Sequence, residues 1–483
     1  MSPDFAMLLG VCRDGGAEPR SDSRKVRPGD IFAAVPGETD DGARFIPAAA
    51  KAGAAFIVCR PDVGREILTA AEDCRIIFHD NPREALWLLA QARWRTDRLP
   101  LKIFGVTGTN GKTTVSCLLE SLFAAIGEKV GIVGTIAYRW PGHSQAAPLT
   151  TPDTLTLHSL LGRMADAGVT VAVMEVSSHA LEQQRVYGIP FDGAIFTNLT
   201  QDHLDYHPDI ESYFAAKAKL FLHLPQRDKA MSVNGDDHFG RRLLDLCPSA
   251  LPFGLDRCDR GPRLKGEIIT SGPQGLHLRM RYKDAAWDLA SPLVGSFNAS
   301  NLLAVQALGL KLGLSPKSFS ALEAFAGVNG RLERIGNSAG LNIFVDYAHT
   351  PDALVNALKA LRDSGFARII TVFGCGGNRD RSKRPLMGEA VARFSDVAIL
   401  TSDNPRFENP CAIIDDVLPG LANAREAHVE QDRRKATALA LKMLTKNDAL
   451  LIAGKGHEDY QIIQGIKHHY SDQEVVRELL RCG

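Results

Sequence analysis

A short glycine-rich stretch, Gly108–Thr114 (GTNGKTT), combines residue types that hold phosphate groups. It follows an apolar run at 101–107 and precedes a segment with the apolar spacing of a helix. In such a loop the backbone N–H groups converge on phosphate oxygens, and the helix N-terminus adds partial positive charge. Lys112 is expected to reach the outer phosphates and Thr113 to hold Mg²⁺. The loop predicts nucleotide binding, although position 106 is valine where the common pattern has glycine.

Acidic and histidine side chains follow the next two predicted strands. Glu175 ends the apolar run 169–175, and His203 follows the run 191–197, so the two are placed to share one ion. Mg²⁺ prefers oxygen ligands with an occasional imidazole. The alternative is a solvated strand-end carboxylate and a helix-capping histidine, and either interpretation fits each residue singly. His207 lies four residues after His203, but the glutamate of the zinc-protease pattern is missing, so we exclude zinc.

Composition excludes several classes of function. The net charge of zero gives no reason to expect a nucleic-acid partner. No apolar stretch approaches the length of a bilayer span and the N-terminus does not resemble a secretion signal, so no membrane insertion is expected. The nine cysteines are scattered without a C-x-x-C pair, which argues against disulfides and structural zinc. The expected location is the cytoplasm.

The apolar runs predict the elements that must position these residues. In the first hundred residues short apolar runs alternate with alanine-rich helical stretches, which predicts a small α/β domain ending near Pro100. The next runs, at 127–135, 169–175 and 191–197, are continuous rather than alternating, which is typical of buried parallel strands. The stretch 266–289 alternates like antiparallel strands.

The last third of the chain contains four apolar runs that each lead straight into polar residues. They lie within 341–354, 367–380, 396–410 and 448–460. Because ligands of open α/β sheets bind beyond the carboxyl ends of the strands, we expect the four polar segments to share one edge. The predicted organisation is three α/β domains, at 1–97, 98–329 and 330–483.

Nine motifs resemble those of the Mur ligases and stand in the order in which that family has them, within a resemblance that runs from about residue 23 to 460. They are GTNGKTT (108–114), EVSSHAL (175–181), TNLTQDHLDYH (197–207), AAK (215–217), GRLE (330–333), VDYAHTPD (345–352), FGCGGNRDRSKRPLMG (373–388), SDNPR (402–406) and AGKGHED (453–459). The family's loop carries GTNGKT rather than the full phosphate-loop pattern, which accounts for Val106.

The resemblance implies a fold and an activity. The fold would have a small N-terminal UDP-binding domain, a central phosphate-loop domain with a parallel sheet, and a C-terminal Rossmann-like domain. The activity would be an ATP-dependent amide ligase of peptidoglycan precursor synthesis, acting as a monomer. It would add meso-2,6-diaminopimelate to the D-Glu side-chain carboxyl of UDP-MurNAc-L-Ala-D-Glu through an acyl phosphate, giving ADP and phosphate.

Four residues are implied in catalysis by the same resemblance: Lys112, Glu175, His203 and Lys217. In this family the lysine that matches Lys217 is carbamylated by CO₂, which turns a cation into a carboxylate-bearing side chain. The resemblance therefore implies a metal site made of Thr113, Glu175, His203 and the carbamate of Lys217. The structural alternative for Lys217 is an ordinary helix lysine whose stem covers apolar surface and whose ammonium reaches solvent.

Two sets of substrate contacts follow from the resemblance. The ATP contacts would be Gly108, Thr109, Asn110, Gly111, Lys112, Thr113, Thr114, Asn298, Arg331 and Asp346. The contacts to the UDP-MurNAc dipeptide would be Ser23, Glu38, Thr39, Asp40, Thr150, Thr151, Ser177, Gln183 and Arg185. Asn298 and Asp346 also fit purely structural roles. Acidic side chains do not favour a diphosphate, so the segment 38–40 is expected to act through its backbone.

The added amino acid is implied by SDNPR and its neighbours. The diaminopimelate contacts would be Arg379, Asp403, Asn404, Pro405, Arg406, Gly454 and Glu458. Meso-diaminopimelate carries an ammonium and a carboxylate at its far end, whereas L-lysine carries only the ammonium. Arg406 can pair with that carboxylate in a two-point fork, and Asp403 and Glu458 can receive the ammonium or orient the arginine. The alternative for this segment is a surface turn.

Other functions stay open at this point. Folylpolyglutamate synthase, a related amide ligase, would add glutamate to a folate. A phosphate-loop kinase or transport ATPase would need no amine substrate. A non-catalytic nucleotide-binding scaffold would have no use for Lys112, Glu175, His203 and Lys217 together.

Overall fold

The computed structural model describes residues 2–37, 40–203, 206–222, 226–255 and 263–482. The chain divides into two compact units, Met1–Phe253 with Ala304–Leu314, and Gly254–Leu303 with Ser315–Gly483. The three domain ranges expected from the sequence stay predictions.

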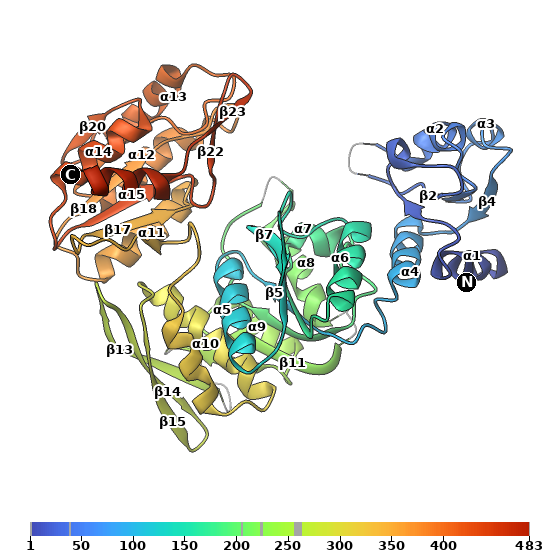
Figure 1. Cartoon of the computed structure of the whole chain (residues 1–483), viewed down its shortest axis with the longest axis horizontal. Coiled ribbons are helices and arrows are strands. Elements are labelled where there is room, and N and C mark those ends of the chain that lie inside the picture. Colours follow the sequence, from blue (N-terminus) through green and yellow to red (C-terminus); the bar gives the residue numbers. More distant parts are fainter. Residues whose placement is uncertain (1, 38–39, 204–205, 223–225, 256–262, 483) are drawn as a thin grey trace. The chain divides into compact units, whose positions relative to one another are not determined.

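The N-terminal part of the first unit is a parallel sheet between helices. Its strands, in the order β1-β2-β3-β4, are β1 (Pro19–Arg20), β2 (Ile31–Ala33), β3 (Phe56–Cys59) and β4 (Arg75–Phe78). Successive side chains of a strand point to opposite faces. Ile31 and Ala33 therefore pack with residues of α1 (Pro3–Arg13) and α4 (Pro82–Trp94), whereas Phe32 packs with residues of α2 (Ile46–Lys51). Figure 1 shows α2 on one side of β2 and α1 and α4 on the other. The predicted alternation of strands and helices in this part of the chain is confirmed.

A larger sheet follows in the same unit, with strand order β12-β11-β10-β5-β9-β6-β7-β8. The strands are β5 (Lys102–Thr107), β6 (Val130–Val133), β7 (Ala137–Trp140), β8 (His143–Ala146), β9 (Val171–Glu175), β10 (Phe191–Phe196), β11 (Gln226–Asn234) and β12 (Leu251–Gly254). The helices are α5 (Lys112–Ala125), α6 (Thr154–Asp166), α7 (Ser178–Glu182), α8 (Ile210–Leu222) and α9 (His238–Leu246). All pairings from β12 to β6 are parallel, as the continuous apolar runs predict, and β7 and β8 add an antiparallel edge.

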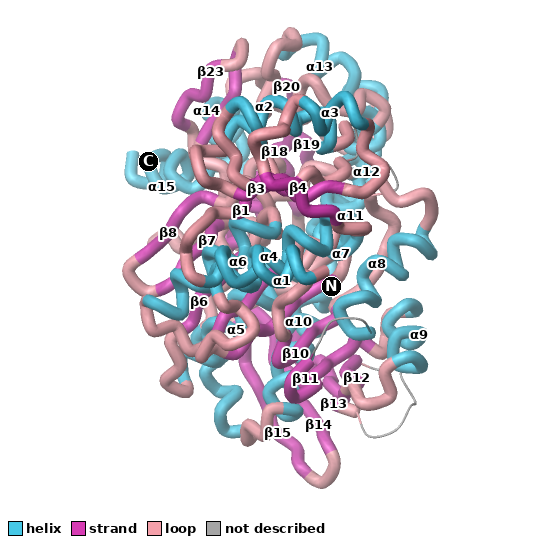
Figure 2. Tube along the Cα trace, turned by 90° about the vertical axis from the view of Figure 1, so that its right-hand side faces the viewer, coloured by secondary structure: helices cyan, strands magenta, loops and turns pink. Residues whose placement is uncertain are grey.

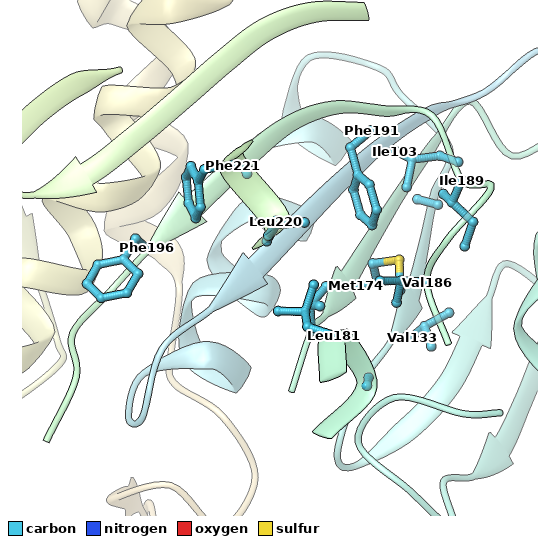
Figure 3. Packing of buried hydrophobic residues seen from close by; sticks show 14 of the residues in the cluster. Ile103, Val133, Met174, Leu181, Val186, Ile189, Phe191, Phe196, Leu220 and Phe221 are labelled. Atoms are coloured by element: carbon cyan, nitrogen blue, oxygen red, sulfur yellow. The ribbon is translucent and has the colours of Figure 1, made fainter. Parts of the chain in front are cut away.

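The core of this sheet fixes where its polar strand ends lie. Met174 of β9 and Phe191 of β10 pack with Leu181 of α7, Leu220 of α8 and Val133 of β6, all buried (Figure 3). Because the apolar halves of these strands are anchored here, the residues after them are held at the carboxyl edge of the sheet.

The second unit begins with an antiparallel ribbon, as the alternation at 266–289 predicts. It consists of β13 (Leu264–Gly272), β14 (Gly275–Tyr282) and β15 (Ala285–Ser291), which run side by side (Figures 1 and 2). Helix α10 (Ser296–Lys311) and a 3₁₀ segment, Pro316–Ala324, follow along the chain.

The C-terminal sheet has the order β16-β17-β21-β18-β19-β20 and is parallel except for β16. Its strands are β16 (Glu333–Arg334), β17 (Asn342–Asp346), β18 (Ile369–Phe373), β19 (Val397–Leu400), β20 (Ala427–Val429) and β21 (Ala449–Ala453). One face packs on α11 (Pro351–Asp363), α12 (Lys383–Phe394) and α13 (Pro410–Val417), the other on α14 (Arg433–Met443) and α15 (Asp472–Cys482). A hairpin, β22 (Tyr460–Ile463) with β23 (Ile466–His469), follows β21. The four polar segments thus follow parallel strands at one edge, as predicted.

Among the helices that the structure describes, none combines the length and apolar character needed to cross a lipid bilayer.

Candidate active site

The phosphate loop connects β5 to α5 and depends on its glycines. Gly108 has a φ of +151°, and a Cβ there would lie 1.9 Å from Thr197 Oγ1, so only glycine fits. Lys112 Nζ donates to the carbonyls of Gly108 and Thr109, both at 2.9 Å. The ammonium of Lys112 is thus bound by carbonyls of the same loop. Helix α5 begins at Lys112, and the N–H groups of its first turn are directed at the loop.

Glu175, at the end of β9, lies beside this loop and is buried with 1% of its surface exposed. Its Oε2 accepts hydrogen bonds from Thr113 Oγ1 at 3.0 Å and Thr135 Oγ1 at 2.9 Å, and its Oε1 accepts from Thr135 N at 3.0 Å. The interpretation of Glu175 as a solvated strand-end carboxylate is therefore wrong. Two hydroxyls and a carboxylate form an oxygen-rich group that fits Mg²⁺.

Thr135 is a site residue that the sequence reasoning missed. It follows β6, and its hydroxyl lies 3.0 Å from Thr150 Oγ1, so it connects Glu175 to a residue of the expected dipeptide contacts. Its position at the end of a buried apolar run could have identified it, because the same position identified Glu175.

Lys217, on α8, points inward rather than to solvent. It is 1% exposed, its Nζ donates to the Gly108 carbonyl at 2.9 Å, and Nζ lies 4.5 Å from the centroid of the Tyr213 ring. The interpretation as a lysine that reaches solvent is therefore wrong. Burial, and next the charge of Lys112, hold the pKa of the Lys217 ammonium well below its ordinary value, while Asp202 acts in the opposite direction.

His203 lies in a loop before α8 with a φ of +54°. Its ring lies 4.9 Å from that of His179 and 6.0 Å from that of Tyr213, the ring that Lys217 also contacts. In the described parts of the chain, no group of three or more His, Cys, Asp or Glu side chains is arranged to hold a metal ion. A shared ion between His203 and Glu175 therefore stays a prediction. His207 is buried and bonded through Nε2 to Ser178 Oγ at 3.0 Å.

The expected dipeptide contacts from residue 150 onward form one connected group. Thr151 Oγ1 donates to the Glu175 carbonyl at 2.8 Å and accepts from Ser177 N at 3.0 Å. Arg185 donates through Nη1 to the Thr151 carbonyl at 3.1 Å and through Nε to Gln183 Oε1 at 2.8 Å. These polar groups thus continue directly from the strand end that carries Glu175.

The expected contacts in the N-terminal sheet are described only in part. Ser23 begins a 3₁₀ turn, and Asp40 pairs with Arg44 at 2.7 Å. Glu38 and Thr39 lie outside the described residues. Arg83, which the sequence reasoning missed, donates to the carbonyls of Pro36 at 2.6 Å and Gln183 at 3.1 Å, which ties the loop after β2 to the dipeptide group.

In the second unit, two of the three residues expected to contact the nucleotide form hydrogen bonds with residues near them in the sequence. Asn298 is buried, donates to the Val294 carbonyl at 2.9 Å and accepts from Asn301 at 3.1 Å, which fits the structural alternative. Asp346 accepts from the backbone N–H groups of Leu332 at 2.5 Å and Ala348 at 2.7 Å. Burial raises the pKa of the Asp346 carboxyl, and nearby Arg331 opposes this.

Arg331 differs from them, because its buried Nε has no hydrogen-bond partner among the described residues. Its guanidinium lies over the Tyr347 ring, 5.0 Å from the centroid. A guanidinium held by an aromatic face keeps hydrogen-bond donors available for an anion.

The residues expected to bind the amino acid gather at the carboxyl edge of the C-terminal sheet. Asn404 Nδ2 donates to Glu458 Oε2 at 3.0 Å, and Arg406 Nη1 donates to the Gly377 carbonyl at 2.8 Å. Asp403 is buried beside Gly454, whose φ of +117° suits only glycine. The surface-turn alternative is wrong, because residues 403–405 are all buried. Arg379 is exposed.

Three family models match the chain in order along its length. "Mur ligase family, catalytic domain" matches residues 20–94, "Mur ligase middle domain" 106–309, and "Mur ligase, glutamate ligase domain" 330–456. The chain belongs to the Mur ligase family. The resemblance seen in its motifs is thus confirmed.

Similar Mur ligases include proteins named UDP-N-acetylmuramoyl-L-alanyl-D-glutamate–2,6-diaminopimelate ligase. The one from Lawsonia intracellularis is 54% identical over 463 residues, which cover 95% of each chain. Those from Synechococcus elongatus and Parabacteroides distasonis are 44% and 43% identical, over 95% and 98% of this chain and 92% and 96% of theirs.

Solved structures of Mur ligases share the fold. A structure of a ligase with the same name has a TM-score of 0.70 and 32% identity, covering 96% of this chain and 94% of its own. Folylpolyglutamate synthase of Mycobacterium tuberculosis has a TM-score of 0.59 at 18% identity, over 82% of this chain and 94% of its own, which is a likeness of fold alone. The predicted α/β fold with a central parallel-rich sheet is confirmed.

Proposed function

We propose that this Mur ligase adds meso-2,6-diaminopimelate to the D-Glu side-chain carboxyl of UDP-MurNAc-L-Ala-D-Glu, with ATP converted to ADP and phosphate. The reaction contributes a peptide bond to a peptidoglycan precursor. Relatives from 42% to 54% identical carry the name of this ligase, which supports the proposal. ATP as co-substrate and Mg²⁺ fit the phosphate loop and the oxygen-rich group around Glu175.

The chemical task explains the charges at the phosphate loop. A carboxylate is a poor electrophile, so its oxygen attacks the γ-phosphorus of ATP, ADP leaves, and the acyl phosphate is then attacked by the amine with release of phosphate. Two anions must meet in the first step, which requires cations at the point of transfer. Lys112 provides one, and Mg²⁺ held by Thr113 and Glu175 would neutralise phosphate oxygens.

Lys217 would complete this group as a carbamate. Its buried amine lies next to the phosphate loop, and its lowered pKa favours the neutral form, whose nitrogen lone pair can bond to the carbon of CO₂ with loss of one proton. The product is an anion that can act with His203 as a metal ligand. The unmodified ammonium would repel a metal ion.

The observation that carries the choice of amino acid is a chain of hydrogen bonds at the edge of the C-terminal sheet. Arg406 donates to the Gly377 carbonyl, the Gly377 N–H donates to the Asn404 carbonyl, and Asn404 Nδ2 donates to Glu458, so a guanidinium and a carboxylate belong to one bonded group. Meso-diaminopimelate offers a carboxylate and an ammonium at its far end. With L-lysine bound, Arg406 would lie without its anion, which costs on the order of several kcal/mol when the guanidinium is desolvated.

The test is phosphate release from ATP with the UDP-dipeptide, with meso-diaminopimelate, and with both. The proposal requires sustained release only with both substrates, and a tripeptide product by mass spectrometry. Sustained release with one acceptor alone would indicate a kinase or ATPase. Turnover with a folate and glutamate in place of these substrates would indicate a folylpolyglutamate synthase.

A further inference from the structure

Lys455 is a buried cation in the middle of the amino-acid site. It is the second residue after β21 and has no exposed surface. Its Nζ lies 3.1 Å from Asp403 Oδ1 as an ion pair, and it donates to Asn404 Oδ1 at 3.2 Å and to the Tyr460 carbonyl at 2.8 Å. Two of these three partners are residues expected to bind the amino acid.

The contacts of Lys455 determine which way the Asn404 amide faces. The backbone N–H of Ile462 also donates to Asn404 Oδ1, at 2.9 Å. With two donors on one side, the amide oxygen must face them, so Nδ2 is directed at Glu458 Oε2. Lys455 therefore acts on Glu458 through Asn404.

Lys455 also sets the charge of the pocket. Its ion pair with Asp403 is neutral as a whole, and so is the neighbouring buried pair of Arg433 with Asp472 at 2.7 Å. Glu458, by contrast, is held by the neutral donors Asn404 Nδ2 and Tyr460 Oη, the latter at 3.3 Å. Its negative charge is not cancelled by these bonds.

We propose that Lys455 is a positioning residue that sets amino-acid specificity. By neutralising Asp403 and orienting Asn404, it leaves Glu458 as the counter-ion for the ammonium of the incoming amino acid, opposite Arg406 for the carboxylate. Glu458 and Arg406 then match the two charges of a zwitterionic end group, whereas a lone ammonium leaves Arg406 without an anion. The inference rests on the proposed function and assigns Asp403 to Lys455 rather than to the substrate.

The test is a double-mutant cycle of Lys455→Met and Asp403→Asn. The measured quantity is the ratio of kcat/KM for meso-diaminopimelate to that for L-lysine, at saturating ATP and UDP-dipeptide. If turnover of L-lysine is below detection, its Ki against diaminopimelate replaces its kcat/KM. KM values for ATP and the UDP-dipeptide are measured in parallel and should stay within about twofold of wild type, since none of the side chains that Lys455 pairs with in the described structure is an expected contact of ATP or the UDP-dipeptide.

The two single variants change the pocket charge in opposite directions. Lys455→Met leaves Asp403 as an extra anion, so the ratio should fall by about tenfold toward L-lysine. Asp403→Asn leaves an extra cation, so the ratio should rise by a similar factor. The double variant restores neutrality with near-isosteric side chains and should return the ratio to within about threefold of wild type. A purely structural role would lower activity without these opposite signs.

A matched control lies at the other edge of the same sheet. Arg368, before β18, pairs with Asp448 at 3.2 Å, so Arg368→Met breaks an ion pair of this sheet and should leave the ratio unchanged. If Lys455→Met does not fold, Asp403→Asn and the double variant carry the test. An unchanged ratio in Asp403→Asn, or equal losses for both amino acids in every variant, would overturn the inference. Absence of diaminopimelate turnover in the wild type would instead overturn the proposed function.

Discussion

Thr135→Val removes one hydroxyl from the group around Glu175 and keeps the shape of the side chain. The hydroxyl donates to Glu175 Oε2 at 2.9 Å, whereas the backbone N–H of residue 135 keeps its own bond to Oε1 at 3.0 Å. A hydrogen bond to a carboxylate is worth about 1.5–3 kcal/mol when its partner is buried. Thr113 Oγ1 remains as a second donor to Oε2, so we expect the stabilisation lost in Thr135→Val to lie near the lower end of this range.

The loss can be measured without turnover. Opening of the segment after β6 exposes the amide N–H of residue 135, so hydrogen exchange of a peptide covering 130–140 should become about tenfold faster, the factor that corresponds to 1.4 kcal/mol. The kcat/KM for the UDP-dipeptide should fall by at least a similar factor, because Thr135 also contacts Thr150.

A matched control is Thr69→Val. Thr69 is exposed on α3 (Arg65–Thr69), and its hydroxyl donates to the carbonyl of Arg65 within the same helix, so the effect on stability should stay within about 0.5 kcal/mol. Wild-type exchange and wild-type kcat/KM in Thr135→Val would refute the view that Thr135 orients Glu175.

Three further predictions concern other parts of the chain. Lys217→Ala should lose most activity and recover part of it with added short carboxylic acids, and full activity of the unrescued variant would contradict the carbamate. Lys219→Ala, on the same helix as Lys217, removes an ion pair to Glu182 of α7 and should stay active. Arg406→Ala should reduce the preference for meso-diaminopimelate over L-lysine when both amines are assayed under identical conditions. An unchanged preference would contradict the two-point pairing of Arg406 with the substrate carboxylate. Burial lowers the pKa of His158 to about 4, so the unfolded chain takes up the proton first and stability falls as pH decreases from about 6.5 toward 4, by up to ~3 kcal/mol. In His158→Gln the urea midpoint of unfolding should depend less on pH across that interval. The same pH dependence as in the wild type would contradict the role of His158.

Much of the fold could be predicted from local patterns. Strands β5, β9 and β10 are visible in the sequence as continuous apolar runs, and β13 to β15 as a run in which apolar and polar residues alternate. Both patterns can be recognised from neighbouring residues, because the direction of a side chain along a strand depends on its neighbours only. The phosphate loop was predictable for the same reason, since Gly108 adopts a backbone conformation that other residues rarely adopt.

The candidate site could be predicted only where the type of a residue by itself indicates a chemical role. Glu175 ends one predicted strand and Arg406 lies in the polar segment that follows another, and their types suggest metal and carboxylate binding. Thr135, Arg83 and Lys455 were missed, because each acts through a partner at least 40 residues away in the sequence.

The amino-acid sequence alone therefore predicted the buried parallel strands around the sites, the antiparallel ribbon, the phosphate loop and the family, since these depend on spacing within short segments. Tertiary structure alone decided that Lys217 is buried against Gly108 and that Lys455 cancels the charge of Asp403. The physical reason is that burial and ion pairing depend on which distant segments the folded sheets bring into contact, and these two factors set the charge state of a side chain.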